Sequence, residues 1–307
     1  MALVRGKDVL DKASDEKYAV GAFNINNMEI LQAVISAADN LRSPVILGVS
    51  EGAIEYADIK YILAMVKAAA DSTNIPIVLH LDHGKNFEVI LQCIRYGFTS
   101  LMIDASHLPL EQNIEATRRV VQVAHPLGIS VEAELGRLQG VEDMVSVAEK
   151  DAILINPQEA GLFVRETGVD SLAPAIGTSH GAFKFTGKAE LDFARLKETK
   201  KATQIPLVLH GASSVPADVL EKAYKYGADI PGAMGVPIAS LQKAIKLGIS
   251  KVNVDTDLRL AFTAAIREAL AISPGQFDPR KILGPARDAM TELVSAKIKV
   301  LGSDQKA

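Results

Sequence analysis

The stretch "IPIVLHLDHG" at residues 75–84 decides the fold, and an altered copy, "IPLVLHGASS", follows at 205–214. Each copy places a run of Ile, Val and Leu between a proline and a polar cluster, which is typical of a short strand buried on both faces in a parallel sheet. A histidine directly follows each run. Because α/β proteins hold their chemistry at the carboxyl ends of parallel strands, the two copies predict an α/β fold with functional histidines at two strand ends.

Short apolar runs of this kind alternate with helix-like segments along the chain. The helix-like segments include 27–41, 111–128 and 158–168, whose apolar residues recur every three or four positions. No Pro/Gly/Ser-rich linker divides the sequence, so we expect residues 1–307 to form a single domain. The apolar runs predict the eight strands of a (β/α)8 TIM barrel: 18–24, 44–50, 76–82, 100–106, 130–135, 171–176, 206–211 and 250–255.

Four segments depart from the regular repeat. Extended loops follow strand five (136–151) and strand six (177–190), and long loops at strand ends are usually functional. An insertion at 227–237 precedes an extra helix before strand eight. Residues 277–302 have the pattern of a C-terminal helical extension, which we expect to cover the barrel or to contact another subunit.

The composition narrows the class of partner and the compartment. The formal net charge of −4 mixes both signs without a long Lys/Arg block, so we expect a small-molecule partner and neither nucleic acid nor membrane. Cys93 is the only cysteine, which excludes disulfides and thiolate zinc clusters and fits a reducing compartment. The N-terminal segment is charged early, and no apolar run approaches the roughly 18 residues of a membrane span, so we predict a cytoplasmic protein.

Histidines gather at the predicted strand ends. Closure of the barrel would bring the strand-end histidines together over one face of the barrel. Catalytic zinc requires three protein ligands and an open fourth position. Alternation along the strand puts His80 on the same face as Asp82, so we expect His80 to pack inside the barrel and His83, just outside the strand, to reach a metal. His107 and His125 are expected to be structural. The strand-end histidines are His80, His83, His180 and His210.

Carboxylates also occupy predicted strand ends, where a buried charge is costly unless another group pairs with it or uses it. We expect Asp104 and Glu132 to form structural salt bridges layered in the barrel. Asp82 is the candidate for chemistry because it adjoins His83. The full set is Asp82, Asp104, Glu132, Glu134 and Asp255.

Turns of small and polar residues follow the last three predicted strands. They read "GTSHG" (177–181), "HGASS" (210–214) and "NVDTD" (253–257). Small residues expose backbone N–H groups, and phosphate sites in barrels often form from the last loops and a nearby helix start. Since histidines accompany the first two turns, the sequence predicts a phosphorylated substrate beside a metal.

These motifs together resemble the class II, zinc-dependent fructose-1,6-bisphosphate aldolases. The resemblance runs from "GAFNINN" to "FDPRKILGPAR" and so covers nearly the whole chain. It is specific because several motifs occur together: "LHLDHG" (79–84), "VEAELG" (131–136), "AIGTSHGAFK" (175–184), "LVLHGAS" (207–213) and "KVNVDTDLRLAF" (251–262).

The resemblance implies an aldehyde-lyase of glycolysis and gluconeogenesis. This enzyme would cleave fructose 1,6-bisphosphate reversibly into dihydroxyacetone phosphate and glyceraldehyde 3-phosphate, with zinc stabilising the enediolate. Asp82 resembles the acid/base at the C4 hydroxyl, and Glu142 the group that handles the C3 proton. The zinc ligands would be His83, His180 and His210, with Glu134 holding the metal in an alternative position.

The resemblance also implies the substrate pocket and the assembly. Arg259 could come from a neighbouring subunit of a homodimer or homotetramer, and a monovalent cation, Na⁺ or K⁺, would lie near the glycine loops. Asn253 resembles the residue that steadies the enediolate. The ketone phosphate would contact Gly181, Lys184, Gly211, Ser213, Asp255 and Thr256, and the other end of the sugar would contact Asn24, Ser50, Arg259 and Arg280.

Three alternatives stay open at this point. A tagatose-1,6-bisphosphate aldolase shares fold, metal and first product, although "NVDTD" favours fructose. A Schiff-base aldolase needs a lysine at a strand's carboxyl end, whereas Lys251 opens strand eight. A non-catalytic barrel that binds a sugar phosphate or metal would not need Asp82 beside the metal positions.

Overall fold

The computed structural model describes residues 3–136, 139–142, 145–147, 153–180, 191–214, 216–230 and 235–307; for 139–142, 145–147 and 179–180 we describe the backbone alone. Within these residues eight parallel strands close into a barrel, in the order β1, β2, β3, β4, β5, β8, β10, β11 and back to β1. This confirms the predicted TIM barrel, and each predicted strand overlaps an observed one. The strands are β1 (Val20–Asn24), β2 (Val45–Ser50), β3 (Ile77–Gly84), β4 (Ser100–Ile103), β5 (Ser130–Leu135), β8 (Ser171–Pro174), β10 (Leu207–Leu209) and β11 (Ile249–Val254).

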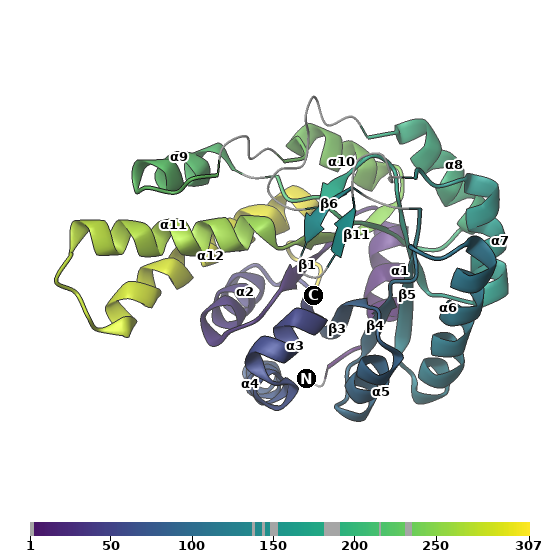
Figure 1. Cartoon of the computed structure of the whole chain (residues 1–307), viewed down its shortest axis with the longest axis horizontal. Helices are drawn as coiled ribbons and strands as arrows, with labels where there is room; N and C mark the ends of the chain where they lie inside the picture. Colours follow the sequence, from purple (N-terminus) through teal and green to yellow (C-terminus); the bar gives the residue numbers. More distant parts are fainter. Residues whose placement is uncertain are drawn as a thin grey trace.

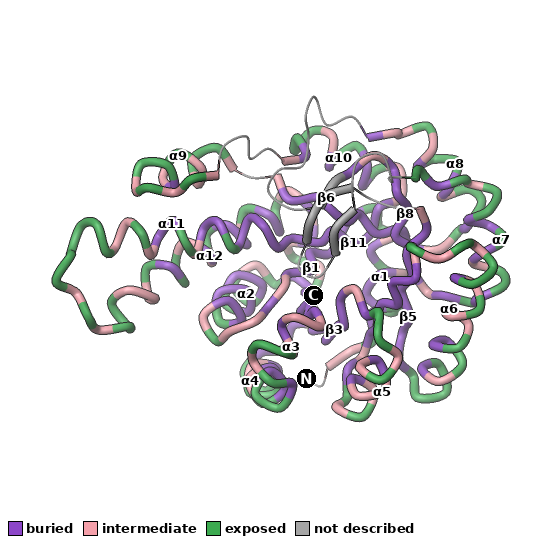
Figure 2. The backbone as a smooth tube through the Cα atoms, in the orientation of Figure 1, coloured by how far each residue is buried: buried purple, intermediate pink, exposed green. Residues whose placement is uncertain are grey.

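Amphipathic helices surround the barrel (Figure 1). Figure 2 shows buried backbone concentrated in the strands and exposed residues on the outer helix surfaces, as their three- and four-residue apolar spacing requires. Several begin at a capping side chain: Asn27, Asn86 and Asn156 each accept a backbone N–H of the first turn. The helices are α2 (Met28–Asn40), α3 (Glu51–Ala57), α4 (Ile59–Asp71), α5 (Phe87–Arg95), α6 (Leu110–Ala124), α7 (Pro157–Thr167), α8 (Phe193–Thr203) and α10 (Ile238–Lys246).

Helix α1 (Gly6–Glu16) closes the amino end of the barrel. A Cβ on Gly6 would lie 2.9 Å from the hydroxyls of Ser100 and Ser130, the first residues of β4 and β5, so the helix start approaches the strands closely. Val9 and Leu10 of α1 pack with inward-facing side chains of the strands, including Ile46. Because this end is filled by apolar side chains, the opposite end is left for chemistry.

The barrel interior changes from apolar to polar along the strands. Alternation sends every second side chain inward. On β3 the inward series reads Val78, His80, Asp82, and on β5 it reads Glu132 and then Glu134, all of them buried. The charged and polar layers therefore lie toward the carboxyl ends, where the sequence predicted the site.

The two extended loops pair with each other. In the described residues, β6 (Gln139–Glu142) runs antiparallel to β7 (Val145–Val147) and parallel to β9 (Ser179–His180). The backbone register joins Gly140 to His180. The loop after β5 and the loop after β8 are thereby held side by side.

The C-terminal extension forms a helical hairpin. Helices α11 (Thr256–Ile272) and α12 (Pro279–Leu301) pack along each other and project from the barrel (Figure 1). Helix α9 (Ala217–Lys225) packs on α11, whereas α10 packs on β11. Among the described residues, α9 thus lies before the 227–237 insertion and α10 lies between the insertion and β11, so the helix expected between the insertion and strand eight is confirmed, and α9 is a second helix that was not predicted.

Among the described residues, no helix combines the length and the apolar composition that a membrane crossing requires.

Candidate active site

The end of β3 contains a local irregularity that places His83. The strand continues to Gly84, two residues beyond its predicted end, so the expectation that His83 lies outside the strand was wrong. Its register against β4 shifts between Leu81 and Gly84, and His83 has a left-handed φ of 49°. Such a bulge redirects a side chain. His83 consequently joins Asp82 on the same side of the site, although strict alternation would separate them.

Asp104, which follows β4, fixes the His83 ring. Nδ1 of His83 donates to Oδ2 of Asp104 at 2.9 Å. Burial favours the neutral ring, but the charges of Asp82 and Asp104 raise the pKa of His83 to about 10. The salt bridge expected of Asp104 is therefore present, but its partner is the candidate metal ligand His83, which the sequence did not predict.

His210 lies directly beyond β10 and is held between carboxylates of β5. Its Nδ1 donates to Glu134 at 3.0 Å and its Nε2 donates to Glu132 at 3.1 Å. Burial favours the neutral ring, but these two carboxylates raise the pKa of His210 to about 9. The His83 and His210 rings are tilted by 58°, with centroids 4.7 Å apart. Residues that are 127 positions apart in the chain thus meet at one point.

Asp82 is clamped between amides of two other strands. Its Oδ2 accepts from Nδ2 of Asn24 and its Oδ1 accepts from Nδ2 of Asn253, each at 2.9 Å. Burial raises the pKa of Asp82, but the charges of His83, Lys251 and His210 outweigh it and hold the pKa below its ordinary value. Asp82 is therefore a fixed, ionised carboxylate.

Below this layer lies a buried charge network that explains His80 and Glu132. Nζ of Lys251 donates to both Glu132 oxygens, at 2.9 and 2.7 Å, and to Nε2 of His80 at 3.0 Å. Burial and the charge of Lys251 lower the pKa of His80 to about 3, so the ring is a neutral acceptor. The expected packing role of His80 and the expected salt bridge of Glu132 are both confirmed. The partner, Lys251, carried no separate signal in the sequence.

The donor set fits a divalent metal with nitrogen and oxygen ligands. One cluster joins Asp82, His83 and His210, and a second joins His83, Asp104 and Glu134; in each, the ligand atoms lie within 4.8 Å of one another. Imidazole with carboxylate is a ligand chemistry that suits zinc. The acidic groups around the histidines also favour a cation here.

Comparison with known proteins identifies the family. The family model "Fructose-bisphosphate aldolase class-II" matches residues 4–306. This chain belongs to the class II fructose-bisphosphate aldolase family. It is 51% identical to the fructose-bisphosphate aldolase of Thermus caldophilus, covering 99% of this chain and 100% of that one. It is 52% identical to the fructose-bisphosphate aldolase of Helicobacter pylori strain J99, covering 99% of each.

Solved structures of aldolases share the barrel. The crystal structure of the YdjI aldolase from Escherichia coli K12 superposes with a TM-score of 0.82 at 34% identity and covers 100% of both chains. A structure described as a putative fructose-1,6-biphosphate aldolase from Coccidioides immitis gives a TM-score of 0.81 at 30% identity, covering 98% of this chain and 97% of that chain.

Part of the class II site expected from the resemblance falls on the two paired loops. The backbone of Glu142 ends β6 and that of His180 ends β9, so the loops that carry them are neighbours. The side chains of Glu142 and His180 lie outside the described residues, and so do Gly181 and Lys184.

The remaining residues expected to bind phosphate or sugar lie at the ends of three strands, β2, β10 and β11. Gly211, with a left-handed φ of 59°, and Ser213 follow β10, while Asp255 and Thr256 join β11 to α11; all four are buried. Ser50 ends β2 and its hydroxyl caps α3. These residues gather at the carboxyl ends of the strands.

The two arginines expected at the sugar differ in their position relative to this cluster. Arg259 on α11 is held by Asp255, with a side chain 47% exposed. Arg280 is the second residue of α12, which begins at the end of the hairpin far from the barrel (Figure 1), and its side chain is 88% exposed and paired with Asp278. Within one chain, Arg280 does not join the site.

Proposed function

We propose that this chain catalyses the reversible aldol cleavage of fructose 1,6-bisphosphate into dihydroxyacetone phosphate and glyceraldehyde 3-phosphate, as a step of glycolysis and gluconeogenesis. The observation that carries the proposal is the clamped Asp82 carboxylate within the His83–His210 cluster, at the mouth of a barrel of this family. Near-full coverage of relatives named for this activity supports the substrate.

Zinc would be held by His83, His180 and His210, with Glu134 as an alternative ligand. For His210 to bind it, one of its present bonds to Glu132 or Glu134 must give way. Since Nδ1 of His83 is engaged by Asp104, Nε2 is the atom of that ring offered to the metal. When bound, the metal supplies Lewis-acid polarisation of the ketone oxygen.

Asp82 would move the first proton. As the C3–C4 bond of the sugar breaks, the C4 hydroxyl becomes the aldehyde and loses its proton, which Asp82 accepts. The amides of Asn24 and Asn253 hold both carboxylate oxygens in place, so the base does not have to be reoriented during the reaction. Oδ1 of Asn253 is buried and has no partner among the described residues, which leaves an acceptor for a substrate hydroxyl.

Glu142 would complete the reaction. The electron pair of the broken bond stays with C3 and the ketone, and Glu142 returns a proton to C3 to give dihydroxyacetone phosphate. The pairing of β6 with β9 supports this division, because the loop of Glu142 is held beside the loop of His180.

The substrate phosphate would bind at the turns after β8, β10 and β11, with Gly181, Lys184, Gly211, Ser213, Asp255 and Thr256. A monovalent cation, Na⁺ or K⁺, would use backbone carbonyls of the same turns. We place the enzyme in the cytoplasm, with residues 1–307 working as one aldolase domain.

We further propose a homodimer or homotetramer. The hairpin of α11 and α12 exposes large apolar side chains at its far end, where Ile272 is 68% exposed and Phe277 is 91% exposed. A second copy would cover them and would bring its Arg259 or Arg280 within reach of a neighbouring site. Analytical ultracentrifugation tests the assembly.

The decisive experiment is a coupled assay of the purified protein on fructose and tagatose 1,6-bisphosphates. We expect cleavage of the fructose substrate with the higher kcat/KM, loss of cleavage after chelation and recovery with zinc. Activity that survives complete chelation, or a preference for tagatose bisphosphate, would overturn the proposal.

A further inference from the structure

A buried ionic cluster joins the C-terminal hairpin to the turn after β10. Nζ of Lys297, on α12, lies 2.5 Å from Oδ2 of Asp257, on the first turn of α11. The same ammonium donates to Oγ of Ser214, and the backbone N–H of Ser214 donates to Asp257 at 3.1 Å. The Lys297 and Asp257 side chains are only 7% and 0% exposed. Three segments far apart in the chain therefore meet through one buried pair of charges.

The opposite side of this turn is held by backbone. The N–H of Val236 donates to the carbonyl of Ser213 at 3.1 Å. A Cβ on Gly235 would lie 2.4 Å from that carbonyl oxygen and 2.3 Å from the carbonyl carbon of Ser214, so this close approach needs glycine. The peptide between Ser213 and Ser214 is thus held by the backbone of Gly235 and Val236 on one side and by the Lys297–Asp257 pair on the other.

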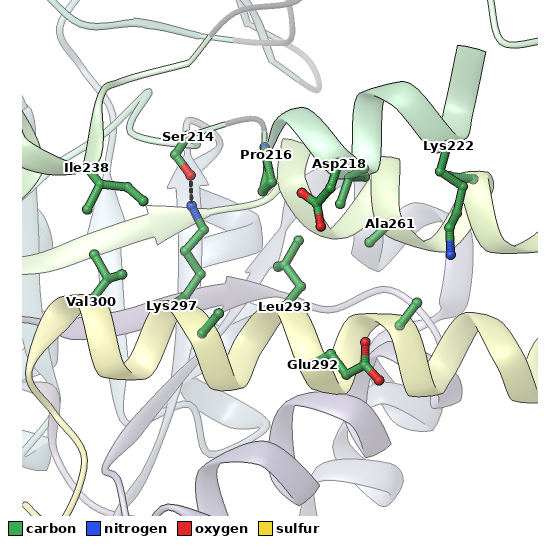
Figure 3. Close-up of a pocket in the computed structure, with 14 residues that line it drawn as sticks. Ser214, Pro216, Asp218, Lys222, Ile238, Ala261, Glu292, Leu293, Lys297 and Val300 are labelled. Atoms are coloured by element: carbon green, nitrogen blue, oxygen red, sulfur yellow. Dashed lines mark hydrogen bonds between the residues drawn. The ribbon is translucent and has the colours of Figure 1, made fainter. Parts of the chain in front are cut away.

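Packing alone does not account for the position of Lys297. Figure 3 shows its side chain rising from α12 to Ser214 along a cavity of about 400 Å³ between α9, α10, α11 and α12. Taking two charges out of water costs free energy, and apolar side chains of similar size often stabilise a fold equally well. A buried pair with directed hydrogen bonds does fix orientation, which is what the turn carrying Ser213 requires.

We infer that Lys297 and Asp257 are positioning residues for the phosphate-binding turn. They hold Ser214, and through it Ser213 and Gly211, in the conformation that receives a substrate phosphate. This inference rests on the proposed function, which assigns Ser213 and Gly211 to the phosphate. Lys297 contacts no reacting atom: it acts through Ser214 and Asp257.

The test compares Lys297→Met, Ser214→Ala and the double variant Lys297→Met/Asp257→Asn. Lys297→Met leaves the Asp257 carboxylate buried without its partner, which could prevent folding. The double variant removes both charges and therefore stays informative in that case. Lys222→Met is the matched control, because Lys222 lines the same cavity but its side chain is 42% exposed and pairs with Glu268. Each protein is assayed for KM, kcat, zinc content and inhibition by inorganic phosphate.

We expect KM for the bisphosphate and the inhibition constant of inorganic phosphate to rise together, by about tenfold or more, with zinc content unchanged and kcat within about threefold. Lys222→Met should match the wild type. A lower melting temperature with unchanged KM and phosphate inhibition in all three variants would overturn the inference, since the pair would then serve stability alone. If the wild type fails to cleave fructose 1,6-bisphosphate, the proposed function fails instead, and inhibition or binding of phosphate still reports on the turn.

Discussion

His83 and Asp104 are joined across neighbouring strands by a 2.9 Å hydrogen bond from Nδ1 to a carboxylate oxygen. The same pairing of groups occurs outside the barrel, where Nε2 of His125 lies 2.9 Å from Asp170. The His83 side chain is 10% exposed and that of His125 is 38% exposed. Only the buried pair faces other ionisable groups of the site, so only there does the carboxylate set the orientation of a candidate metal ligand.

Asp104→Asn should weaken metal binding. Carboxylates that orient a ligating histidine contribute roughly 10- to 100-fold to metal affinity, so we expect a loss of that size in zinc affinity measured by competition with a chelator. Asp170→Asn provides the control, since it removes the equivalent partner from a histidine far from the metal cluster. Equal zinc affinities in the two variants would show that Asp104 does not support a metal ligand.

Lys251→Met should destabilise the barrel strongly. It leaves Glu132 buried without its ammonium partner, and breaking a buried pair in this way costs about 3–5 kcal/mol. Urea unfolding measures the loss, and Lys251→Met/Glu132→Gln should recover part of it because no unpaired charge remains. A single variant as stable as the wild type would contradict the network.

Lys251 should also form no Schiff base that borohydride can trap. Its Nζ is engaged by Glu132 and His80 in the middle layer and is 1% exposed, so it is closed to a ketone substrate. Treatment with borohydride in the presence of dihydroxyacetone phosphate should leave the wild-type enzyme active and unlabelled. A trapped adduct on Lys251 would instead support Schiff-base chemistry.

The strands could be predicted from the sequence because each is an apolar run bounded by polar or turn residues, a signal carried by consecutive residues. The role of Asp104 could not, since it depends on the bulge at His83, and a change of one residue in register decides which side chains meet. Helix α9 was not predicted for a related reason. That α11 covers it is decided by tertiary packing and not by consecutive residues.

Cys93 should make stability fall at alkaline pH. Burial, assisted by the charge of Glu51, raises the pKa of this thiol from 9.0 to about 12. Below pH 9 the thiol is protonated in both folded and unfolded chains, so its contribution is fully present. As the pH rises from 9 toward 12 only the unfolded chain ionises, and the free energy of unfolding should fall by about 1.4 kcal/mol per pH unit.

The measurement compares urea unfolding of the wild type and Cys93→Ala at pH 8 and at pH 10.5. The alanine variant loses packing at both pH values. The difference in free energy of unfolding between the wild type and the variant therefore changes with pH only through ionisation of the thiol. If the free energies of unfolding of the two proteins fell by the same amount between the two pH values, the raised pKa of Cys93 would be contradicted. In the native protein the thiol should also resist alkylation at pH 8, because almost none of it is thiolate.

Asp82→Ala should separate the two proton transfers. The variant loses the proposed base at the C4 hydroxyl but keeps the proposed ligands His83 and His210, so we expect zinc to stay bound and kcat for cleavage to fall by at least about 10²-fold. Exchange of the C3 proton of dihydroxyacetone phosphate with solvent should survive better, since we assign that step to Glu142. Glu142→Ala is the matched variant and should lose exchange along with cleavage. If Asp82→Ala lost exchange and cleavage to the same extent with zinc still bound, one carboxylate would serve both steps, and the clamp by Asn24 and Asn253 would hold a group with a different task.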